Sequence, residues 1–405
     1  MASSTSRTFS RIALAAALSA VGSLPAAAQE PIKIGFMAAL SGLFSPIGQD
    51  MQRGAQLLVK QVGEIKGRKI ELVVEDSEGK PAVALRKADR LVSESKVHAL
   101  LGIFSSAEII ALGGAADKLG VPILTTNSGT PRATGERCHP MVFRSNPNDA
   151  MTVRGVADWL RGNEPARKGK WYIVAHDYEW GQGAAKAFKD AAAKMGVSII
   201  GEDYAPLDTK DWSTYINKIS AAGADYVWAP VIVSVVTDFI KQARSFGLLD
   251  KTRLLAVAGV TDSQLEAVGG VADGVMAASW ATWTVKHPNM AKFTDAYWKE
   301  YKVTPGFQAI LAYNGAGLLV DALSRAGSLS GADVAKALET AKFDGAYGMV
   351  VMRKFDHQAS VPVFIGQVGA APANQFGAKW AVNVVHEAAA TVSEVPPQET
   401  GCKGL

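Results

Sequence analysis

Several motifs of catalytic and nucleotide-binding proteins are absent from this sequence of 405 residues. It contains no P-loop, no Gly-Xaa-Ser-Xaa-Gly nucleophile motif and no His-Glu-Xaa-Xaa-His metal motif. Gly181-Gln182-Gly183 lacks the third glycine of a dinucleotide fingerprint, and the six histidines are scattered without ligand spacing. We therefore expect no enzyme, no cofactor and no metal site. A hydrolase built from dispersed residues is the alternative, because it would leave no such motif.

Charge of one sign and long hydrophobic runs are also scarce. The formal net charge is +4, and no block of like charges stands out. Such a balance is not typical of proteins that bind nucleic acid or an anionic membrane surface. No segment after residue 28 offers the roughly 20 uninterrupted apolar residues that a transmembrane helix needs. We expect a mature chain that is soluble and has no nucleic-acid partner.

Cysteine is rare, since the chain has only Cys138 and Cys402. In an oxidising compartment an even number of cysteines favours pairing, and no third cysteine competes. We predict a disulfide between the two; a pair of free thiols, one of them in a frayed tail, is the alternative. No cysteine follows the expected export signal directly, so we expect no N-terminal lipid.

The first 28 residues have the pattern of a cleaved export signal. Arg7 and Arg11 precede an apolar run at residues 12–24, and the small residues Ala26, Ala27 and Ala28 follow it. The run is shorter than the roughly 20 residues of a membrane anchor. We predict cleavage after Ala28 and a location in the periplasm; an uncleaved anchor is the alternative.

Strand-like and helical patterns alternate along the rest of the chain. We expect strands at residues 32–37, 97–103, 121–126, 171–176, 197–203, 226–230 and 253–258, and helices from about residue 48 and at 106–118, 182–195 and 237–246. The alternation favours α/β architecture, with parallel sheets covered by helices on both faces. One domain of about 150 residues would not accommodate so many units, so we expect two lobes.

Three segments are typical of connections between such lobes, namely residues 143–149, 278–284 and 354–358. They divide the chain into lobe 1, residues 29–147 and 282–354, and lobe 2, residues 148–281 and 355–385. Residues 386–405 are rich in Ala, Thr, Ser, Glu and Pro. We predict that this C-terminal tail is poorly ordered.

Small hydroxyl residues gather in the loops after two neighbouring strands of lobe 1. In α/β sheets ligands bind beyond the carboxyl ends of the strands, where helix N-termini favour a negative group. Ser106 either caps the helix that follows it or binds an anion. In the later loop, at residues 125–131, Gly129 either allows close approach to a ligand or forms a simple turn. Ser106, Ser128 and Thr130, with neighbouring amides, would be enough for a buried carboxylate.

Lobe 2 offers aromatic surface at a strand end, in residues 177–181. We predict that Trp180 closes over the ligand, and a packing role in the core is the alternative.

Together these segments resemble the substrate-binding proteins of ABC importers, in the branched-chain amino-acid (Leu/Ile/Val-binding) family. Each match is weak alone, but their order and spacing over residues 31 to 368 are specific. The resemblance is carried by residues 32–35, 40–42, 102–106, 125–134, 138–140, 143–144, 178–183, 208–211, 242–247, 343–345 and 355–357.

The resemblance implies two doubly wound lobes, as in type I periplasmic binding proteins, joined by three crossing strands and closing on a ligand. In that family, residues of the second and third loops bind the α-carboxylate of the ligand. Those roles fall on Ser106 or Ser105, and on Ser128 and Thr130. Other contacts to the ligand fall on Ile47, Tyr178, Trp180, Ile232 and Gln308.

Two departures from the family pattern bear on the ligand. The family's amino-acid binders place a glutamate after the strand that matches residues 253–258, where it meets the α-ammonium. Here the only acid is Asp262, a few positions late. A tyrosine of the far lobe is replaced by Val231-Ile232. An aromatic or oxo acid therefore fits comparably with a hydrophobic amino acid, and Trp180 suits a ring.

We therefore predict the solute-binding component of an ABC importer. It would capture a small carboxylate-bearing ligand in the cleft by a hinge motion and deliver it to a membrane permease with its ATPase subunits. We expect a monomer. A periplasmic sensor that presents its bound solute to a receptor is the alternative.

Overall fold

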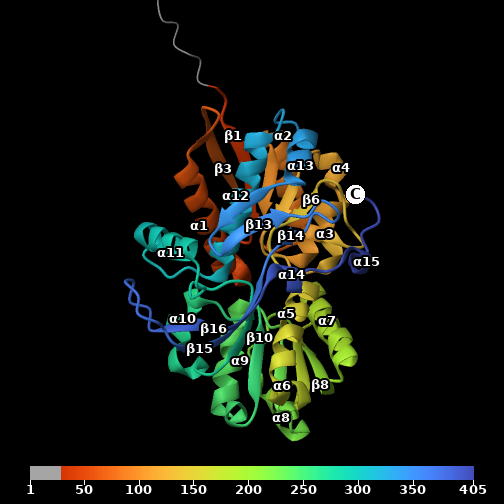
Figure 1. The fold of residues 1–405 in the computed structure, drawn as a ribbon, viewed down its shortest axis with the longest axis vertical. Helices are drawn as coiled ribbons and strands as arrows, with labels where there is room; N and C mark the ends of the chain where they lie inside the picture. Colours follow the sequence, from red (N-terminus) through yellow and green to blue (C-terminus); the bar gives the residue numbers. More distant parts are fainter. Residues whose placement is uncertain (1–28) are drawn as a thin grey trace, which may run out of the picture.

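The computed structural model describes residues 29–405, which form two lobes stacked along the long axis of the molecule (Figure 1). The predicted export signal lies in residues 1–28 and is outside the described residues. Within the described part, no helix is long and apolar enough to cross a membrane.

Lobe 1 is built on a six-stranded sheet in the order β2-β3-β1-β4-β5-β6, parallel except for β2. Phe36 and Met37, neighbours on β1, are both buried, but they belong to two separate hydrophobic clusters. Successive side chains of a strand point to opposite faces, so this sheet needs a helical layer on each side. Its strands are β1 (Ile32–Ala38), β2 (Glu64–Ile65), β3 (Arg68–Asp76), β4 (Ala99–Gly102), β5 (Ile123–Thr125) and β6 (Val142–Arg144).

The helices of lobe 1 come from both halves of the chain. Helices α1 and α12 pack against each other, and residues of α2 and α3 share the second cluster with Met37. They are α1 (Ser45–Val62), α2 (Pro81–Ser93), α3 (Ser106–Gly114), α4 (Ala116–Leu119), α11 (Pro288–Tyr301), α12 (Phe307–Arg325) and α13 (Gly331–Leu338), with short 3-10 turns η1 (Gly42–Phe44) and η2 (Pro131–Thr134).

Lobe 2 has a seven-stranded sheet in the order β16-β15-β11-β10-β9-β7-β8. Its first five strands along the chain are parallel, and β15 and β16 add an antiparallel hairpin at one edge. The strands are β7 (Lys170–His176), β8 (Ser198–Ala205), β9 (Tyr226–Ala229), β10 (Arg253–Val257), β11 (Met276–Ser279), β15 (Val363–Ala370) and β16 (Trp380–Ala388). The helices are α5 (Asp149–Gly162), α6 (Glu164–Lys168), α7 (Glu179–Met195), α8 (Ser213–Ala222), α9 (Val233–Ser245) and α10 (Asp262–Val268), with 3-10 turns η3 (Leu248–Asp250) and η4 (Gly269–Ala272).

The third crossing between the lobes lies later than predicted. A small antiparallel sheet, β12 (Lys342–Gly345), β13 (Gly348–Met352) and β14 (Ala359–Ser360), lies with lobe 1 and contains β14. Residues 354–358 therefore form a turn within this sheet, and the chain crosses to β15 after Ser360. The turn is nevertheless part of the hinge region, because Arg144 of β6 donates its backbone N–H to the carbonyl of His357 (2.9 Å).

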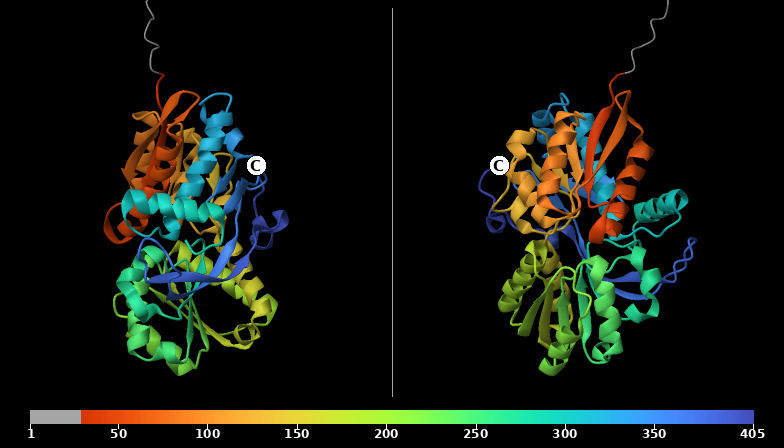
Figure 2. Two further views of the ribbon diagram at one scale, coloured as in Figure 1. Left: turned by 60° about the vertical axis from the view of Figure 1, so that its left-hand side comes forward. Right: turned by 180° about the vertical axis from the view of Figure 1, so that it is seen from behind.

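The C-terminal tail is ordered, which corrects the prediction for residues 386–405. Strand β16 continues to Ala388, and two short helices follow, α14 (Ala390–Ser393) and α15 (Pro397–Thr400). Ser393 and Val395 are buried. The disulfide expected between Cys138 and Cys402 is present, with the two Cα atoms 5.5 Å apart. The two views in Figure 2 show the C-terminus beside lobe 1, although the hairpin that leads to it belongs to lobe 2.

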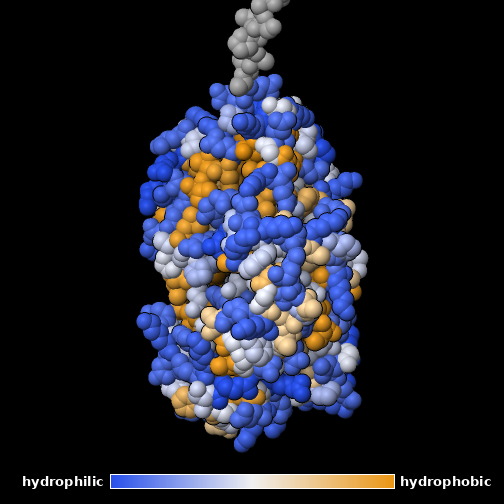
Figure 3. Space-filling model, turned by 90° about the vertical axis from the view of Figure 1, so that its left-hand side faces the viewer, coloured by the Kyte–Doolittle hydropathy of each residue, from blue (hydrophilic) through white to orange (hydrophobic). Residues whose placement is uncertain are grey.

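The apolar residues of the chain are concentrated inside both lobes. On the face seen in Figure 3, hydrophilic residues cover most of the surface, and hydrophobic ones form patches on the upper lobe and near the middle. The largest fully buried side chains include Trp171, Trp228 and Trp280, which lie in lobe 2 or at its crossing. The lobes thus have well-filled interiors.

Candidate ligand-binding site

A cavity lies between the two lobes, beyond the carboxyl ends of strands from both sheets. About 340 Å³ of space, part of it open to solvent, lies between the lining residues. Lobe 1 lines it with Ile47, Phe104, Ser106, Asn127, Gly129, Phe307 and Gln308, and lobe 2 with its crossing adds Tyr178, Trp180, Ile232, Val233, Ala258 and Trp280. Sites at strand ends of this kind are the general rule for open α/β sheets.

The loop between β4 and α3 presents Ser106 to the cavity. Ser105 is the N-cap residue of α3 and forms a capping box with Glu108, whose carboxylate accepts the Ser105 N–H (3.1 Å). Ser106 is the first residue of the helix and not its cap, which corrects one of the two roles predicted for it. Ser105 does not line the cavity. Because helix N-terminal N–H groups lack partners within the helix, the Ser106 end of α3 favours an anion.

The loop after β5 contributes Asn127 and Gly129, whereas Ser128 and Thr130 do not line the cavity. The Ser128 N–H donates to Thr125 Oγ1 (3.2 Å). The Thr130 N–H donates to Ser106 Oγ (3.1 Å), so the two loops are joined at this point. Thr130 Oγ1 donates to Glu179 Oε1 of lobe 2 (3.2 Å). Neither residue lines the cavity in this arrangement, so their direct contacts with the ligand stay predictions.

Gly129 is required by close contact with Trp180. A Cβ atom at position 129 would lie 2.5 Å from Trp180 Cδ1, which no real side chain allows. The indole N–H of Trp180 donates to Asp149 Oδ1 (2.9 Å), and the Trp180 side chain is 5 % exposed. Gly129 and Trp180 come from different lobes, so their contact brings the two lobes together beside the cavity.

The fully buried side chain of Arg144 lies behind the loop that follows β5. Arg144 of β6 donates its guanidinium N–H groups to the carbonyl oxygens of Ser128 and Thr130. Burial lowers the pKa of Arg144 to about 10, which still leaves it charged at neutral pH. Asp149 lies near it, and burial raises the pKa of that carboxyl well above its usual value. Arg144 therefore holds the backbone on both sides of Gly129, and Asp149 lies beside the same loop.

Asp262, the only acid that the sequence offers near the ligand, does not line the cavity. Its carboxylate accepts the backbone N–H of Val382 on β16 (2.9 Å), and burial raises its pKa to about 7. Among residues 29–405, no Asp or Glu side chain lines the cavity. The same part of the chain contains no group of His, Cys, Asp or Glu side chains that could bind a metal ion.

Aromatic rings form most of the remaining wall. Trp280 and Phe307 meet edge to face with centroids 5.9 Å apart, and Tyr178 lies 6.2 Å from Trp180. The Trp280 indole N–H is satisfied by Thr152 Oγ1 (2.9 Å), so its ring is fixed in place. The cavity therefore has an apolar wall and a polar edge formed by Ser106, Asn127, Gly129 and Gln308.

Two sets of direct hydrogen bonds join the lobes on either side of the cavity. On one side Glu179 accepts from Arg132 Nη1 at 3.0 and 3.1 Å, in addition to Thr130. On the other, Thr261 Oγ1 of lobe 2 donates to Gln308 Oε1 (3.0 Å) and accepts the Phe307 N–H (3.2 Å) of lobe 1. The structure therefore represents the closed arrangement of the lobes.

Seven of the predicted contacts line the cavity: Ile47, Ser106, Gly129, Tyr178, Trp180, Ile232 and Gln308. Sequence reasoning missed Phe104, Asn127, Val233, Ala258, Trp280 and Phe307. Phe104 and Asn127 lie inside loops that were singled out, and Trp280 lies inside a predicted crossing. Ala258 could be singled out only from the structure, by its positive φ of 43°. This is a strained backbone conformation of the kind often found at functional sites.

Residues 31–373 match the family model described as periplasmic binding protein. The chain belongs to this family. Among curated relatives of this periplasmic binding protein, Leu/Ile/Val-binding protein homolog 7 of Brucella suis biovar 1 is 27 % identical over 363 residues, covering 85 % of this chain and 90 % of the relative. Homolog 8 of Brucella abortus is 28 % identical over 315 residues, or 74 % and 77 % of the two chains.

Solved structures of similar proteins share the fold. An ABC transporter substrate-binding protein from Sphaerobacter thermophilus is 26 % identical with a TM-score of 0.80, covering 89 % of this chain and 98 % of that one. A solute-binding protein from Rhodopseudomonas palustris BisB5, in complex with 3,4-dihydroxybenzoic acid, is 23 % identical with a TM-score of 0.82 over 89 % and 98 %. The leucine-binding protein LivK of Thermotoga maritima has a TM-score of 0.78 at 21 % identity over 88 % and 99 %.

These comparisons confirm the family resemblance seen in the sequence and the two-lobed type I periplasmic-binding-protein fold. This periplasmic binding protein is a solute-binding component of an ABC transporter. Proteins of this kind bind small ligands and work with a membrane permease.

Proposed function

We propose that this periplasmic binding protein captures a small acid without an ammonium group, an aromatic or oxo acid, and delivers it to the permease of an ABC importer. The ligand occupies the cavity between the lobes and bridges them, so binding favours the closed arrangement. Export by the signal at residues 1–28 would place this step in the periplasm.

The observation that carries the proposal is the distribution of charge around the cavity. Ser106 and the N-terminus of α3 supply hydrogen-bond donors on one edge, and Arg144, with the buried Asp149 beside it, holds the loop behind the same edge. Each hydrogen bond to a charged group contributes roughly 1.5–3 kcal/mol. These groups favour a carboxylate.

An amino acid would also need a partner for its ammonium group. Among the described residues, no acid lines the cavity, and Asp262 is bonded to Val382 instead. A buried ammonium without a counter-charge is strongly penalised. Acids that lack this group are therefore expected to bind more tightly than the corresponding amino acids.

The aromatic wall suits an apolar or ring-shaped body. Trp180, Trp280 and Phe307 present flat surfaces that stack or pack edge to face with a ring. Structural neighbours are described with benzoate and with 4-hydroxybenzoate, and another is named as a leucine-binding protein. Proteins with this fold are thus described with aromatic acids and with leucine. The absence of a lining acid here favours an aromatic acid.

Mass spectrometry of the solute released from natively purified protein tests the proposal. The expected result is a small carboxylic acid without an amine. The protein is then unfolded and refolded to remove the bound solute, and its melting temperature is measured with benzoate, 4-hydroxybenzoate, phenylpyruvate and phenylalanine. The acids without an ammonium group should raise the melting temperature, because stabilisation by a ligand follows its affinity. A sugar or an amine as the released solute, or a panel in which no acid shifts the melting temperature, would contradict it.

A further inference from the structure

The C-terminal segment after β16, residues 389–402, spans from lobe 2 to lobe 1 along the hinge, and we call it the strap. Strand β16 belongs to the sheet of lobe 2, whereas Cys402 is bonded to Cys138 of lobe 1. Figure 1 shows α14 at the waist between the lobes and α15 against lobe 1. The strap is therefore fastened to both moving bodies.

The middle of the strap is bonded to the third crossing between the lobes and to Arg353, which precedes it. Arg353, whose side chain is 9 % exposed, donates Nη1 to the carbonyl of Val395 (3.1 Å) and lies 3.8 Å from a carboxylate oxygen of Glu394. Glu394 also accepts from Ser360 Oγ, and Ser393 Oγ donates to the carbonyl of Val361 (2.7 Å). These contacts hold the strap against the segment that must change direction when the lobes move.

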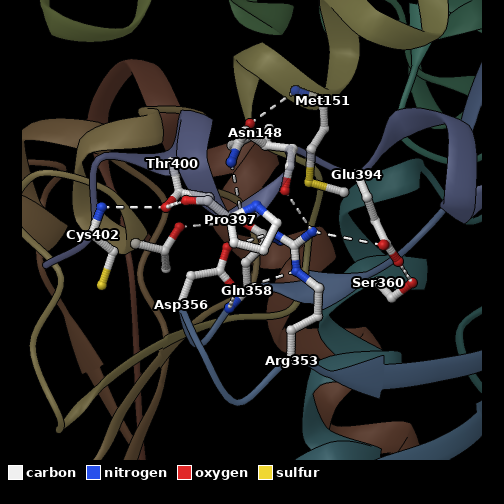
Figure 4. A network of polar contacts seen from close by, with 12 residues as sticks. Asn148, Met151, Arg353, Asp356, Gln358, Ser360, Glu394, Pro397, Thr400 and Cys402 are labelled. Carbon is white, nitrogen blue, oxygen red and sulfur yellow. Dashed lines mark hydrogen bonds and ion pairs between the residues drawn. The ribbon is translucent and has the colours of Figure 1, made fainter. Parts of the chain in front are cut away.

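The same network includes the first crossing, as Figure 4 shows. Gln358 accepts from Asn148 Nδ2 (3.3 Å) and donates Nε2 to the carbonyl of Asn146 (2.8 Å). Asp356, which pairs with Arg353, lies in the same turn as Gln358. Two of the three hinge segments and the strap are thus joined by one set of largely buried polar contacts.

The far part of the strap contacts both lobes. Glu399 pairs with Arg154 of α5 in lobe 2 (3.6 Å). The carbonyl of Thr400 would lie 2.5 Å from a Cβ at Gly135, so the strap lies directly on the lobe 1 loop that carries Cys138. Movement of lobe 2 relative to lobe 1 has to disturb one of these two contacts.

We propose that the strap stabilises the closed arrangement of the lobes in the ligand-free protein, and that the Cys138–Cys402 disulfide keeps it docked. The disulfide does not itself limit opening, because a segment of this length could extend over about 45 Å. It acts by keeping the strap next to Arg353 and Gly135 at a high effective concentration. This inference is independent of which solute the cavity binds.

The test measures the distance between the lobes in ligand-free protein. Spin labels are attached through non-cysteine chemistry at Glu94 of lobe 1 and Lys194 of lobe 2, and the distance distribution is recorded by pulsed electron paramagnetic resonance. A Cys138→Ser, Cys402→Ser double variant should shift the distribution to longer distances. Glu394→Gln, which keeps the disulfide, should shift it in the same direction by less.

A chain that ends at Cys402 is the matched control, since it removes residues 403–405 and leaves the strap intact, so its distribution should match the wild type. Circular dichroism establishes that each variant is folded. If the double variant does not fold, the Glu394→Gln result decides. Distributions that coincide for the wild type and the folded strap variants would overturn the proposal, because the strap would then be a passive tail.

Discussion

Glu179 of α7 and Arg132 of η2 pair between the lobes beside the cavity, with both carboxylate oxygens within 3.1 Å of Arg132 Nη1. Arg132 also pairs with Glu136 of its own lobe (2.7 Å). The two acids together raise the pKa of Arg132, and the hydrogen bond to Glu136 is the largest single cause. Arg132 therefore pairs with Glu179 of the other lobe, a contact that needs the lobes to be closed, and with Glu136 of its own lobe, a contact that does not.

Glu179→Gln is expected to weaken ligand binding modestly, because only the closed state contains the pair. Both side chains are partly exposed, and exposed pairs contribute about 0.2–1 kcal/mol. Calorimetry should show a loss of up to about fivefold that becomes smaller in high salt. Glu136→Gln is the matched control, since it removes a pair within lobe 1 and should leave affinity unchanged. Equal effects of the two variants would argue against a role in closure.

Ser106→Ala should weaken binding of the preferred acid. The variant removes a hydroxyl on the polar edge of the cavity and the acceptor of the Thr130 N–H. The loss of one hydrogen bond to a charged group predicts a change of roughly 10- to 150-fold in affinity. Ser324→Ala is the control, because Ser324 lies in the same lobe on α12, bonds the carbonyl of Asp321 in its own helix and does not line the cavity. Comparable losses in both variants would show that Ser106 does not contact the ligand.

Trp180 should report ligand binding by fluorescence. Its ring lines the cavity and its N–H is bonded to Asp149, so a ligand that enters changes its surroundings. Trp180→Phe is expected to remove most of the fluorescence change and to lower affinity by a few kcal/mol at most. Trp298→Phe on α11, whose ring packs near Phe376, should leave the change intact. A full response in Trp180→Phe would assign this residue to packing alone.

Asp262 should make folding stability depend on pH. Burial raises its pKa from 3.8 to about 7 in the folded protein, so the folded state keeps a proton that the unfolded state has lost. This contribution to stability is fully present below about pH 4 and is lost as the pH rises through 7. Asp262→Asn lacks the titration but can still accept the Val382 N–H. Relative to this variant, the wild type should lose stability between pH 4 and 7.5, by about 4 kcal/mol at most.

Urea unfolding of both proteins at several pH values measures the difference. A gap between wild type and variant that stays constant from pH 4 to 7.5 would show that the carboxyl of Asp262 has an ordinary pKa in the folded protein.

Features that depend on short stretches of sequence could be predicted, and features that depend on distant contacts could not. The strand expected at residues 253–258 is β10 (Arg253–Val257), because its run of apolar residues is a local signal. Ser106 was found in the same way, from its place between a strand and a helix. Asp262, by contrast, is bound by Val382 far along the chain, and no pattern around position 262 indicates this.

Whether the C-terminal tail is ordered could not be predicted from its own sequence either. Its composition predicts a segment that cannot form a core of its own, and it does not form one. It is ordered by contacts with residues elsewhere, such as the bond from Ser393 to Val361 and the disulfide of Cys402. Phe307 is a similar case, because it is the first residue of α12 and lines the cavity together with residues that are distant in the sequence.

The central claim is that the cavity binds a carboxylate and does not provide for an ammonium group. Calorimetric titration with matched pairs tests this most directly, because leucine and 4-methyl-2-oxopentanoate, or phenylalanine and phenylpyruvate, differ chiefly in that group. Benzoate and 4-hydroxybenzoate complete the set. We predict that an acid without an ammonium group binds most tightly and that each oxo acid binds more tightly than its amino acid. Tighter binding of leucine or phenylalanine than of the oxo acids would contradict the account.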